Sequence, residues 1–222
     1  MEYKNLKISG KNGKMYESSK EEKEGYSKVT YGEKNEKVTY HKYIDKIEGK
    51  FAGFGISQMN SDVANITMLN VKIQGENILY TISVPLKTGY GGVSDASKAL
   101  ISAFYGAIPN HSYSVTAFTK QNEKNNKTYD NQVVYVNSLT TMGENGKGLS
   151  TGFIPFNEIP RAKREDDGLG GVTYDNKEVN LFYGSKIKEI SSKFEQVPSG
   201  EHTPQKESEP HVNEEEDDDL PF

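Results

Sequence analysis

The chain has 222 residues, no cysteine and a formal net charge of -5. This length suffices for one sizeable domain with appendages, and the lack of cysteine excludes both a disulfide framework and a thiolate metal site. No apolar run approaches about 18 residues and the first seven residues contain no signal-peptide core, so we expect a soluble cytoplasmic protein with no membrane partner.

The charge is divided unevenly along the chain. Residues 195–222 contain ten acidic side chains and one Lys, which leaves 22 acidic and 26 basic side chains, or +4, on residues 1–194. A mildly basic body with a strongly acidic tail suits a nucleic-acid binder whose tail competes with its ligand, although such a charge is also ordinary for a domain. We predict a folded domain over 1–194 and a disordered linker and interaction tail over 195–222.

A repeated motif lies near the start of the chain. Lys28-Val29-Thr30-Tyr31 recurs at residues 37–40, and a glycine-containing link of five residues separates the copies. Two β-prone runs joined in this way predict a hairpin. Its Lys and Tyr side chains are ordinary for an exposed hairpin, but they are also able to stack on nucleobases.

Three strands are predicted next, over Phe51–Ser57, Ile66–Ile73 and Ile78–Val84. Alternation is clearest in the third, where every second residue from Ile78 is apolar or aromatic. Gly53 and Gly55 predict a bulge or a sharp coil in the first strand, a feature that lets a small sheet curl toward a barrel.

One amphipathic helix is predicted after the third strand. Ser94 is a good N-cap, and apolar residues recur at helical spacing from Ala96 to Phe104. Gly106 and Pro109 are expected to end the helix.

Two more strands are predicted over Ser112–Lys120 and Gln132–Leu139, joined by a polar loop over 121–128. Three strands, a helix and two strands is the succession of an OB-fold, a five-stranded Greek-key barrel that binds oligonucleotides. We therefore predict a mainly β protein with an OB-fold and an extra N-terminal hairpin. An edge strand over Thr173–Phe182 and a terminal helix over Ser185–Phe194 are expected to complete the domain.

Binding of single strands without sequence preference needs aromatic rings on which bases stack, and cations that follow the phosphates. Alternation from the buried Val115 and Val134 turns Phe118 and Tyr135 to the opposite face of the sheet, although both rings also suit a core. The predicted DNA-binding surface consists of Phe118, Lys120, Lys124, Lys127, Tyr129 and Tyr135. The weaker candidates that would extend it are Lys50, Phe51, Lys72, Lys87 and Tyr90.

The end of the chain is its most distinctive stretch. Six consecutive carboxylates, Glu214–Asp219, precede an apolar tip, Leu220-Pro221-Phe222. Like charges repel one another and stay solvated, so we interpret the run as an interaction tail. An apolar tip placed after it indicates a small anchor that a partner buries. The predicted partner-binding residues are Asp217, Asp218, Asp219, Leu220, Pro221 and Phe222.

This tip resembles that of bacterial single-stranded DNA-binding proteins, which typically end in several aspartates followed by Ile or Leu, Pro and Phe. The match covers six residues, and the rest of the chain does not resemble the bacterial proteins, so a bacteriophage-type protein is the closer expectation. The resemblance implies binding and protection of single-stranded DNA during DNA replication, recombination and repair. It also implies that the tip recruits replication and repair proteins.

No catalytic motif accompanies these features. The sequence has no Cys nucleophile, no Walker loop and no His-Glu-x-x-His run, so we expect neither an enzyme nor a cofactor. The alternative function is an interaction module or recombination mediator that imitates the host tip to recruit or block host replication proteins. The sequence leaves a homo-oligomer open.

Overall fold

The structure is a computed structural model that describes residues 1–10, 12–31, 37–60, 65–124, 127–144, 146–166 and 171–195. Side chains are not described for Asn60, Asn122, Lys124, Lys127, Tyr129 and Glu195. The predicted partner-binding tip, Asp217–Phe222, lies outside the described residues.

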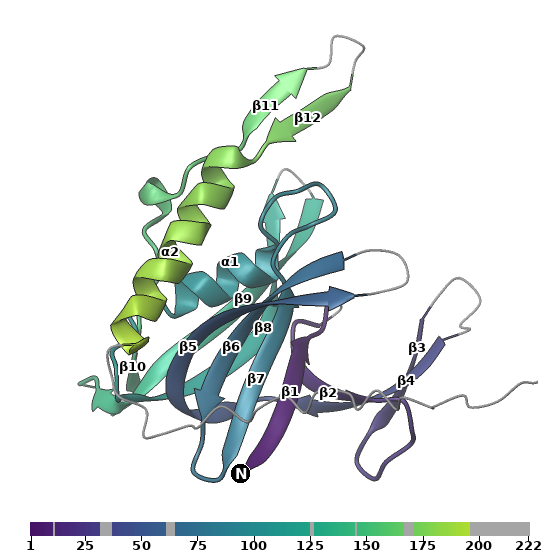
Figure 1. Ribbon diagram of the computed structural model, residues 1–222, viewed down its shortest axis with the longest axis vertical. Coiled ribbons are helices and arrows are strands. Elements are labelled where there is room, and N and C mark those ends of the chain that lie inside the picture. The colour runs from purple at the N-terminus through teal and green to yellow at the C-terminus, as the bar shows by residue number, and fades with distance from the viewer. Residues whose placement is uncertain are drawn as a thin grey trace, which may run out of the picture.

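Most of the described chain belongs to one mixed sheet. Its strands are β1 (Glu2–Ile8), β2 (Met15–Ser19), β3 (Ser27–Tyr31), β4 (Lys37–Ile44), β5 (Ile47–Asn60), β6 (Asn65–Gln74), β7 (Ile78–Pro85), β8 (Ser112–Lys124), β9 (Lys127–Met142) and β10 (Gly148–Ser150). They lie in the order β10-β9-β8-β5-β6-β7-β1-β2-β4-β3, so the sheet has ten strands within the described residues (Figure 1).

Two α-helices, a short 3-10 turn and a separate hairpin complete the described chain. The helices are α1 (Asp95–Ala103) and α2 (Lys177–Glu195), and the 3-10 turn spans Phe156–Glu158. The hairpin consists of β11 (Lys163–Asp166) and β12 (Val172–Asp175). The β11–β12 hairpin projects beyond one end of α2, and β3 and β4 project from the opposite side of the molecule (Figure 1). Neither α1 nor α2, the helices of the described chain, has the length and hydropathy needed to cross a membrane.

The five strands predicted around the helix are all present. β5, β6 and β7 form an antiparallel meander, and β5 also pairs with β8, which continues into β9. The predicted irregularity in the first strand is confirmed, because the β5–β6 register shifts between Phe51 and Phe54 and Gly53 has a φ of 101°. A bulge here bends β5. The bent strand pairs with β6 along one edge and with β8 along the other.

The predicted helix is also confirmed as α1. The Ser94 side chain accepts a hydrogen bond from the Ser97 backbone N–H at 3.2 Å, as an N-cap does. Leu100, Ile101 and the following Phe104 are fully buried. The helix packs against β9 and places this apolar face in the core.

The polar segment over 121–128 was predicted to be a loop, and this prediction was wrong. The β8–β9 ladder continues through it to the pair Lys124–Lys127. The ladder satisfies its backbone groups by hydrogen bonding between the strands, so an exposed hairpin can extend through polar residues that need no burial.

The prediction of an edge strand over Thr173–Phe182 was correct only for its first residues. The Asp175 carboxylate accepts a hydrogen bond from the Lys177 backbone N–H at 2.8 Å, which starts α2 eight residues before the predicted helix. Val179, Tyr183 and Ile190 then lie on one buried face of that helix. The apolar residues of this segment recur at helical spacing, so the chain forms a helix from Lys177 onward. The β propensity of Thr173 and Tyr174 accounts only for the short strand β12.

The N-terminal residues enlarge the sheet beyond the predicted five strands. β1 pairs in parallel with β7 and in antiparallel with β2, and β4 pairs with both β2 and β3. The predicted hairpin of the repeated motif is β3–β4, although its five-residue link lies outside the described residues. The strands β1 to β4 therefore form a continuous extension of the sheet.

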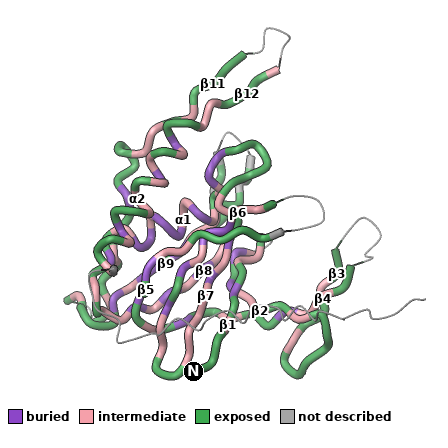
Figure 2. The backbone as a smooth tube through the Cα atoms, in the orientation of Figure 1, coloured by how far each residue is buried: buried purple, intermediate pink, exposed green. Residues whose placement is uncertain are grey.

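The turn between β1 and β2 brings distant parts of the sheet together. The Thr119 backbone N–H donates to the Asn12 carbonyl at 3.1 Å, and the Gln132 side-chain amide donates to the Gly13 carbonyl at 3.1 Å. Leu6 and Met15, on either side of this turn, are fully buried in the same core as the inner residues of β8 and β9. Figure 2 shows that burial is concentrated in the curled part of the sheet and beneath α1, whereas β3 and β4 are mostly exposed.

Gly13 is predicted to be essential for this closure. A Cβ at this position would stand 2.3 Å from both the Phe118 carbonyl carbon and the Thr119 backbone nitrogen, and the residue has a φ of 70°. Gly13→Ala should lower the free energy of unfolding by about 2 to 4 kcal/mol, the sum of overpacking and left-handed strain. Urea denaturation measures the change.

Gly25→Ala is the matched control for Gly13→Ala. Gly25 has a φ of 78° but no atom within 4 Å of its added Cβ, so only backbone strain, about 1 kcal/mol, is expected. Equal losses in the two variants would show that the contact between the turn and β8 contributes nothing.

Candidate nucleic-acid interface

Three aromatic rings lie in a row on the outer face of β8 and β9. The ring centroids of Phe118 and Tyr135 are 5.4 Å apart, and those of Tyr135 and Phe153 are 6.2 Å apart. Tyr135 is 39% exposed and Phe153 46% exposed. We call these three residues the aromatic row.

Strand alternation positions the first two rings. The inner residues Ala117 and Val134 face each other in the ladder and are 3% and 1% exposed, respectively. Their neighbours Phe118 and Tyr135 consequently point outward, and they meet diagonally because Tyr135 pairs with Thr116. The predicted orientation of these two side chains agrees with the structure.

The third ring, Phe153, was missed in the sequence analysis. The Thr151 backbone N–H donates to the Val136 carbonyl at 3.0 Å, and the Ile154 backbone N–H donates to the Ser102 hydroxyl at 3.1 Å. These bonds hold the segment after β10 between β9 and α1, and bury Ile154 while Phe153 stays exposed. The sequence signal was a short apolar run after Gly152, which does not reveal which strand the run contacts.

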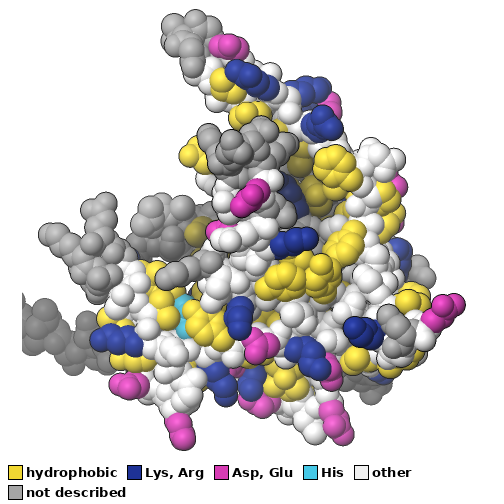
Figure 3. Space-filling model, turned by 180° about the vertical axis from the view of Figure 1, so that it is seen from behind, with side chains coloured by type: hydrophobic (Ala, Val, Ile, Leu, Met, Phe, Trp, Pro, Cys, Tyr) yellow, Lys and Arg dark blue, Asp and Glu magenta, His cyan; other side chains and the backbone are white. Residues whose placement is uncertain are grey.

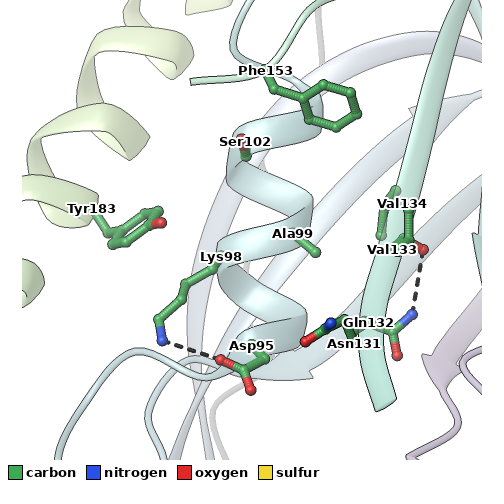
Figure 4. Close-up of a pocket in the computed structure, with 10 residues that line it drawn as sticks. All are labelled: Asp95, Lys98, Ala99, Ser102, Asn131, Gln132, Val133, Val134, Phe153 and Tyr183. Carbon is green, nitrogen blue, oxygen red and sulfur yellow. Dashed lines mark hydrogen bonds and ion pairs between the residues drawn. The ribbon is translucent and has the colours of Figure 1, made fainter. Parts of the chain in front are cut away.

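Two hollows lie at the ends of the aromatic row. One, of about 310 Å³, lies between α1 and β9, and the close-up in Figure 4 shows Phe153 at one end and Asp95 at the other. Its lining residues are Asp95, Lys98, Ala99, Ser102, Asn131, Gln132, Val133, Val134, Phe153 and Tyr183. The other, of about 590 Å³, is lined by Asn12, Phe118, Thr119, Lys120, Gln121 and Asp130.

A cation lines each hollow. The Lys98 ammonium lies 3.1 Å from the Asp95 carboxylate, and Lys120 is exposed. An exposed ion pair such as Lys98–Asp95 is worth little, so a phosphate is able to compete for the Lys98 ammonium. Burial, and to a smaller extent the charge of Asp95, raises the pKa of the Tyr183 hydroxyl, which therefore stays neutral.

The remaining members of the predicted surface lie toward the tip of the β8–β9 hairpin. The backbones of Lys124 and Lys127 pair with each other there, and Tyr129 pairs with Asn122. Their side chains are outside the described part of the chain, so their contribution stays a prediction.

The assignment of Phe51 to the DNA-binding surface is corrected. Its ring stacks on Phe104 with centroids 4.3 Å apart, and the residue is only 3% exposed. The β5 bulge turns Phe51 into the core beneath α1 and α2, where no face of the ring is open to a base.

The other weaker candidates are not brought to the aromatic row. Lys50 pairs with Ser112, which precedes Phe118 by six residues, or about 20 Å of strand. Lys72 lies on β6, which β5 separates from β8. Lys87 and Tyr90 lie between β7 and α1.

Tyr90 lines a separate hollow. This hollow, of about 420 Å³, also contains Tyr174 of β12 and Leu181 of α2. Tyr90 is 95% exposed, so its ring is free to stack, but it belongs to another part of the surface.

The back of the molecule has hydrophobic and charged side chains close together. Figure 3 shows groups of hydrophobic side chains across the middle of this face, with Lys and Arg side chains, and some Asp and Glu side chains, around them. Among the described residues, no three His, Cys, Asp or Glu side chains gather closely enough to hold a metal.

Comparison with protein-family models, curated proteins and solved structures finds no match for this chain.

Removing one ring of the row should weaken single-strand binding. Phe118→Ala, Tyr135→Ala and Phe153→Ala are each expected to lose about 1 to 3 kcal/mol of affinity for oligo-dT if the ring stacks on a base. Fluorescence anisotropy of a labelled oligonucleotide measures the loss, and circular dichroism verifies the fold. Tyr174→Ala is the control, because this ring is 59% exposed on the β11–β12 hairpin and should not affect affinity. Unchanged affinity in a folded variant would remove that ring from the site.

Proposed function

We propose that this protein binds and protects single-stranded DNA, without strong sequence preference, during replication, recombination and repair. The observation that carries the proposal is the aromatic row, whose successive rings are 5.4 and 6.2 Å apart and partly open to solvent. Rings in this arrangement offer stacking surfaces to successive bases of one strand. They make no base-specific hydrogen bonds, so every base is acceptable.

The same surface favours a single strand over a duplex. In a duplex the faces of the bases are occupied by stacking within the helix, and only base edges and phosphates are accessible. Among the described side chains, Lys98 and Lys120 line the hollows at the ends of the row, and each can contact a phosphate. Stacking is therefore expected to supply most of the affinity and the preference for single strands.

We further propose that β5 to β9, with α1 between β7 and β8, constitute an OB-fold. The order β9-β8-β5-β6-β7 and the position of the helix support this assignment. The arrangement differs from a plain five-stranded barrel because β1 pairs with β7 and the β1–β2 turn contacts β8. In OB-folds the face of the second and third strands and the loops after the first and fourth strands bind oligonucleotides. In this correspondence β8 and β9 are the fourth and fifth strands, and the residues that link them lie outside the described chain.

The acidic tail is assigned a second role, the recruitment of replication and repair proteins. This assignment depends on the resemblance of Asp217–Phe222 to the tips of bacterial single-stranded DNA-binding proteins. Its ten carboxylates over 195–222 also repel phosphate, so the tail is expected to compete with DNA for the basic body.

The proposal is tested by anisotropy titrations of labelled oligo-dT and a matched duplex with the full chain and with a chain ending at Val212. We expect the single strand to bind well and the duplex poorly, and the truncation to tighten binding at low salt because it removes competing carboxylates. If neither chain binds the single strand, the proposed function is wrong. The tail would then be the functional part, and the interaction module that imitates a host tip would be the better description.

Deleting Phe222 separates the two roles of the tail. The deletion keeps all the acidic side chains, so the affinity for oligo-dT should stay that of the full chain. Docking on a purified bacterial replication or repair protein that binds such tips should fall by roughly 10-fold or more, since burial of a ring contributes about 1.5 to 3 kcal/mol. Isothermal titration calorimetry measures the docking, and equal affinity with and without the ring contradicts the anchor role.

A further inference from the structure

A second aromatic cluster lies on the N-terminal extension of the sheet, away from the aromatic row. The rings of Tyr16 and His41 are stacked with centroids 4.0 Å apart and planes inclined by 20°. Tyr31 and Tyr43 contact the same imidazole, with centroids at 5.9 and 6.1 Å. We call Tyr16, Tyr31, His41 and Tyr43 the tyrosine cluster.

The cluster is organised around a buried histidine. His41 is 4% exposed, and its Nε2 is hydrogen-bonded to the Tyr31 and Thr39 hydroxyls at 2.9 and 3.0 Å, while its Nδ1 has no partner. Burial, and to a smaller extent the charge of Lys7, lowers the pKa of His41, so the ring is neutral at pH 7. A buried nitrogen without a partner costs free energy, so the rings packed around His41 are held there at some cost in stability.

The cluster occupies one exposed face of the extension. Tyr31 and Tyr43 are 44% and 39% exposed, and β3 and β4 project beyond the curled part of the sheet (Figures 1 and 2). Tyr31 and Tyr43 are therefore the two rings of the cluster that a ligand can reach.

The charges on this face favour a nucleic acid as the occupant. In the strand register Lys7 lies opposite Tyr16, and Lys37 lies opposite Tyr31. No acidic residue of β1, β2, β3 or β4 shares the face. Glu17 lies on the other face, where it accepts a hydrogen bond from Tyr26 at 2.9 Å. Rings on which bases stack, together with cations that contact phosphates, form the composition of a single-strand surface.

The cluster is also continuous with the aromatic row through the chain. The β1–β2 turn, which contacts Thr119 beside Phe118, precedes Tyr16 by only three residues, or about 10 Å of strand. The hollow at the Lys120 end of the row is itself lined by Asn12 of this turn. A strand leaving the row at this end therefore passes toward β2 and β4.

We propose that the tyrosine cluster is a second contact surface for the same single strand, engaged only by oligonucleotides long enough to extend beyond the aromatic row. This inference depends on the proposed function. It predicts a binding mode that changes with the length of the ligand, because a short oligonucleotide occupies the row alone. OB-folds cover about 4 to 16 nucleotides, so an oligomer near the lower end of that range and one longer than the whole range distinguish the contacts.

The test measures the affinity of the full chain for oligo-dT of about 6 and about 24 nucleotides. Tyr43→Ala should weaken binding of the longer oligomer by about 5-fold or more and leave the shorter one unchanged. Tyr43→Phe, which keeps the ring, should bind both as the unmodified chain does. Tyr40→Ala is the matched control, since Tyr40 lies on the same strand with its side chain on the opposite face.

A direct readout is the His41 ring resonance in proton NMR. The longer oligomer should shift it through the ring current of a stacked base, and the shorter one should not. His111, which precedes β8 at the end away from Lys120, should not respond to either oligomer.

The outcomes separate the two proposals. If Tyr43→Ala binds the longer oligomer normally and His41 does not shift, while Phe118→Ala loses affinity, the second surface is absent and the proposed function stands. If the unmodified chain binds neither oligomer, both proposals fail. Weaker binding by Tyr43→Ala of both oligomers, with recovery in Tyr43→Phe, would assign the ring to the primary site and overturn the length-dependent second surface.

Discussion

The structure depends on the close contact of the β1–β2 turn with β8. The Gly13 backbone approaches that of Phe118 and Thr119 so closely that no side chain fits between them, and two hydrogen bonds fix the approach. Through this contact the strands that precede the meander bury Leu6 and Met15 in the same core as the strands that follow it. The contact brings two parts of the sheet together, so that one face of each is buried against the other.

This contact also determines which side chains of β8 and β9 are open to solvent. Once one face of β8 and β9 is committed to the core, alternation turns Phe118 and Tyr135 to solvent, and the segment after β10 adds Phe153 beside them. The turn lines the hollow at the end of the row, so the element that closes the fold also borders the proposed site. The core and the proposed binding site therefore lie on opposite faces of the same two strands.

Electrostatics divide the chain into two functional parts. The body is weakly basic, and its proposed site offers mainly aromatic rings, whereas the tail concentrates ten acidic side chains in the last 28 residues. A surface that binds mainly by stacking tolerates an acidic tail on the same chain, because repulsion between the tail and the phosphates is screened by salt while stacking is not.

The sequence alone determined the local features: the N-cap at Ser94, the irregularity at Gly53, and the outward direction of Phe118 and Tyr135, because periodicity and turn chemistry act over a few residues. It also supplied the whole argument for the tail. Only the tertiary structure decided that Phe51 belongs to the core, that Phe153 lies beside Tyr135, and that Lys50, Lys72 and Tyr90 lie elsewhere on the surface. Which strands become neighbours depends on contacts between residues far apart in the chain, such as Gly13 with Phe118, and those contacts leave no signal in the spacing of a single sequence.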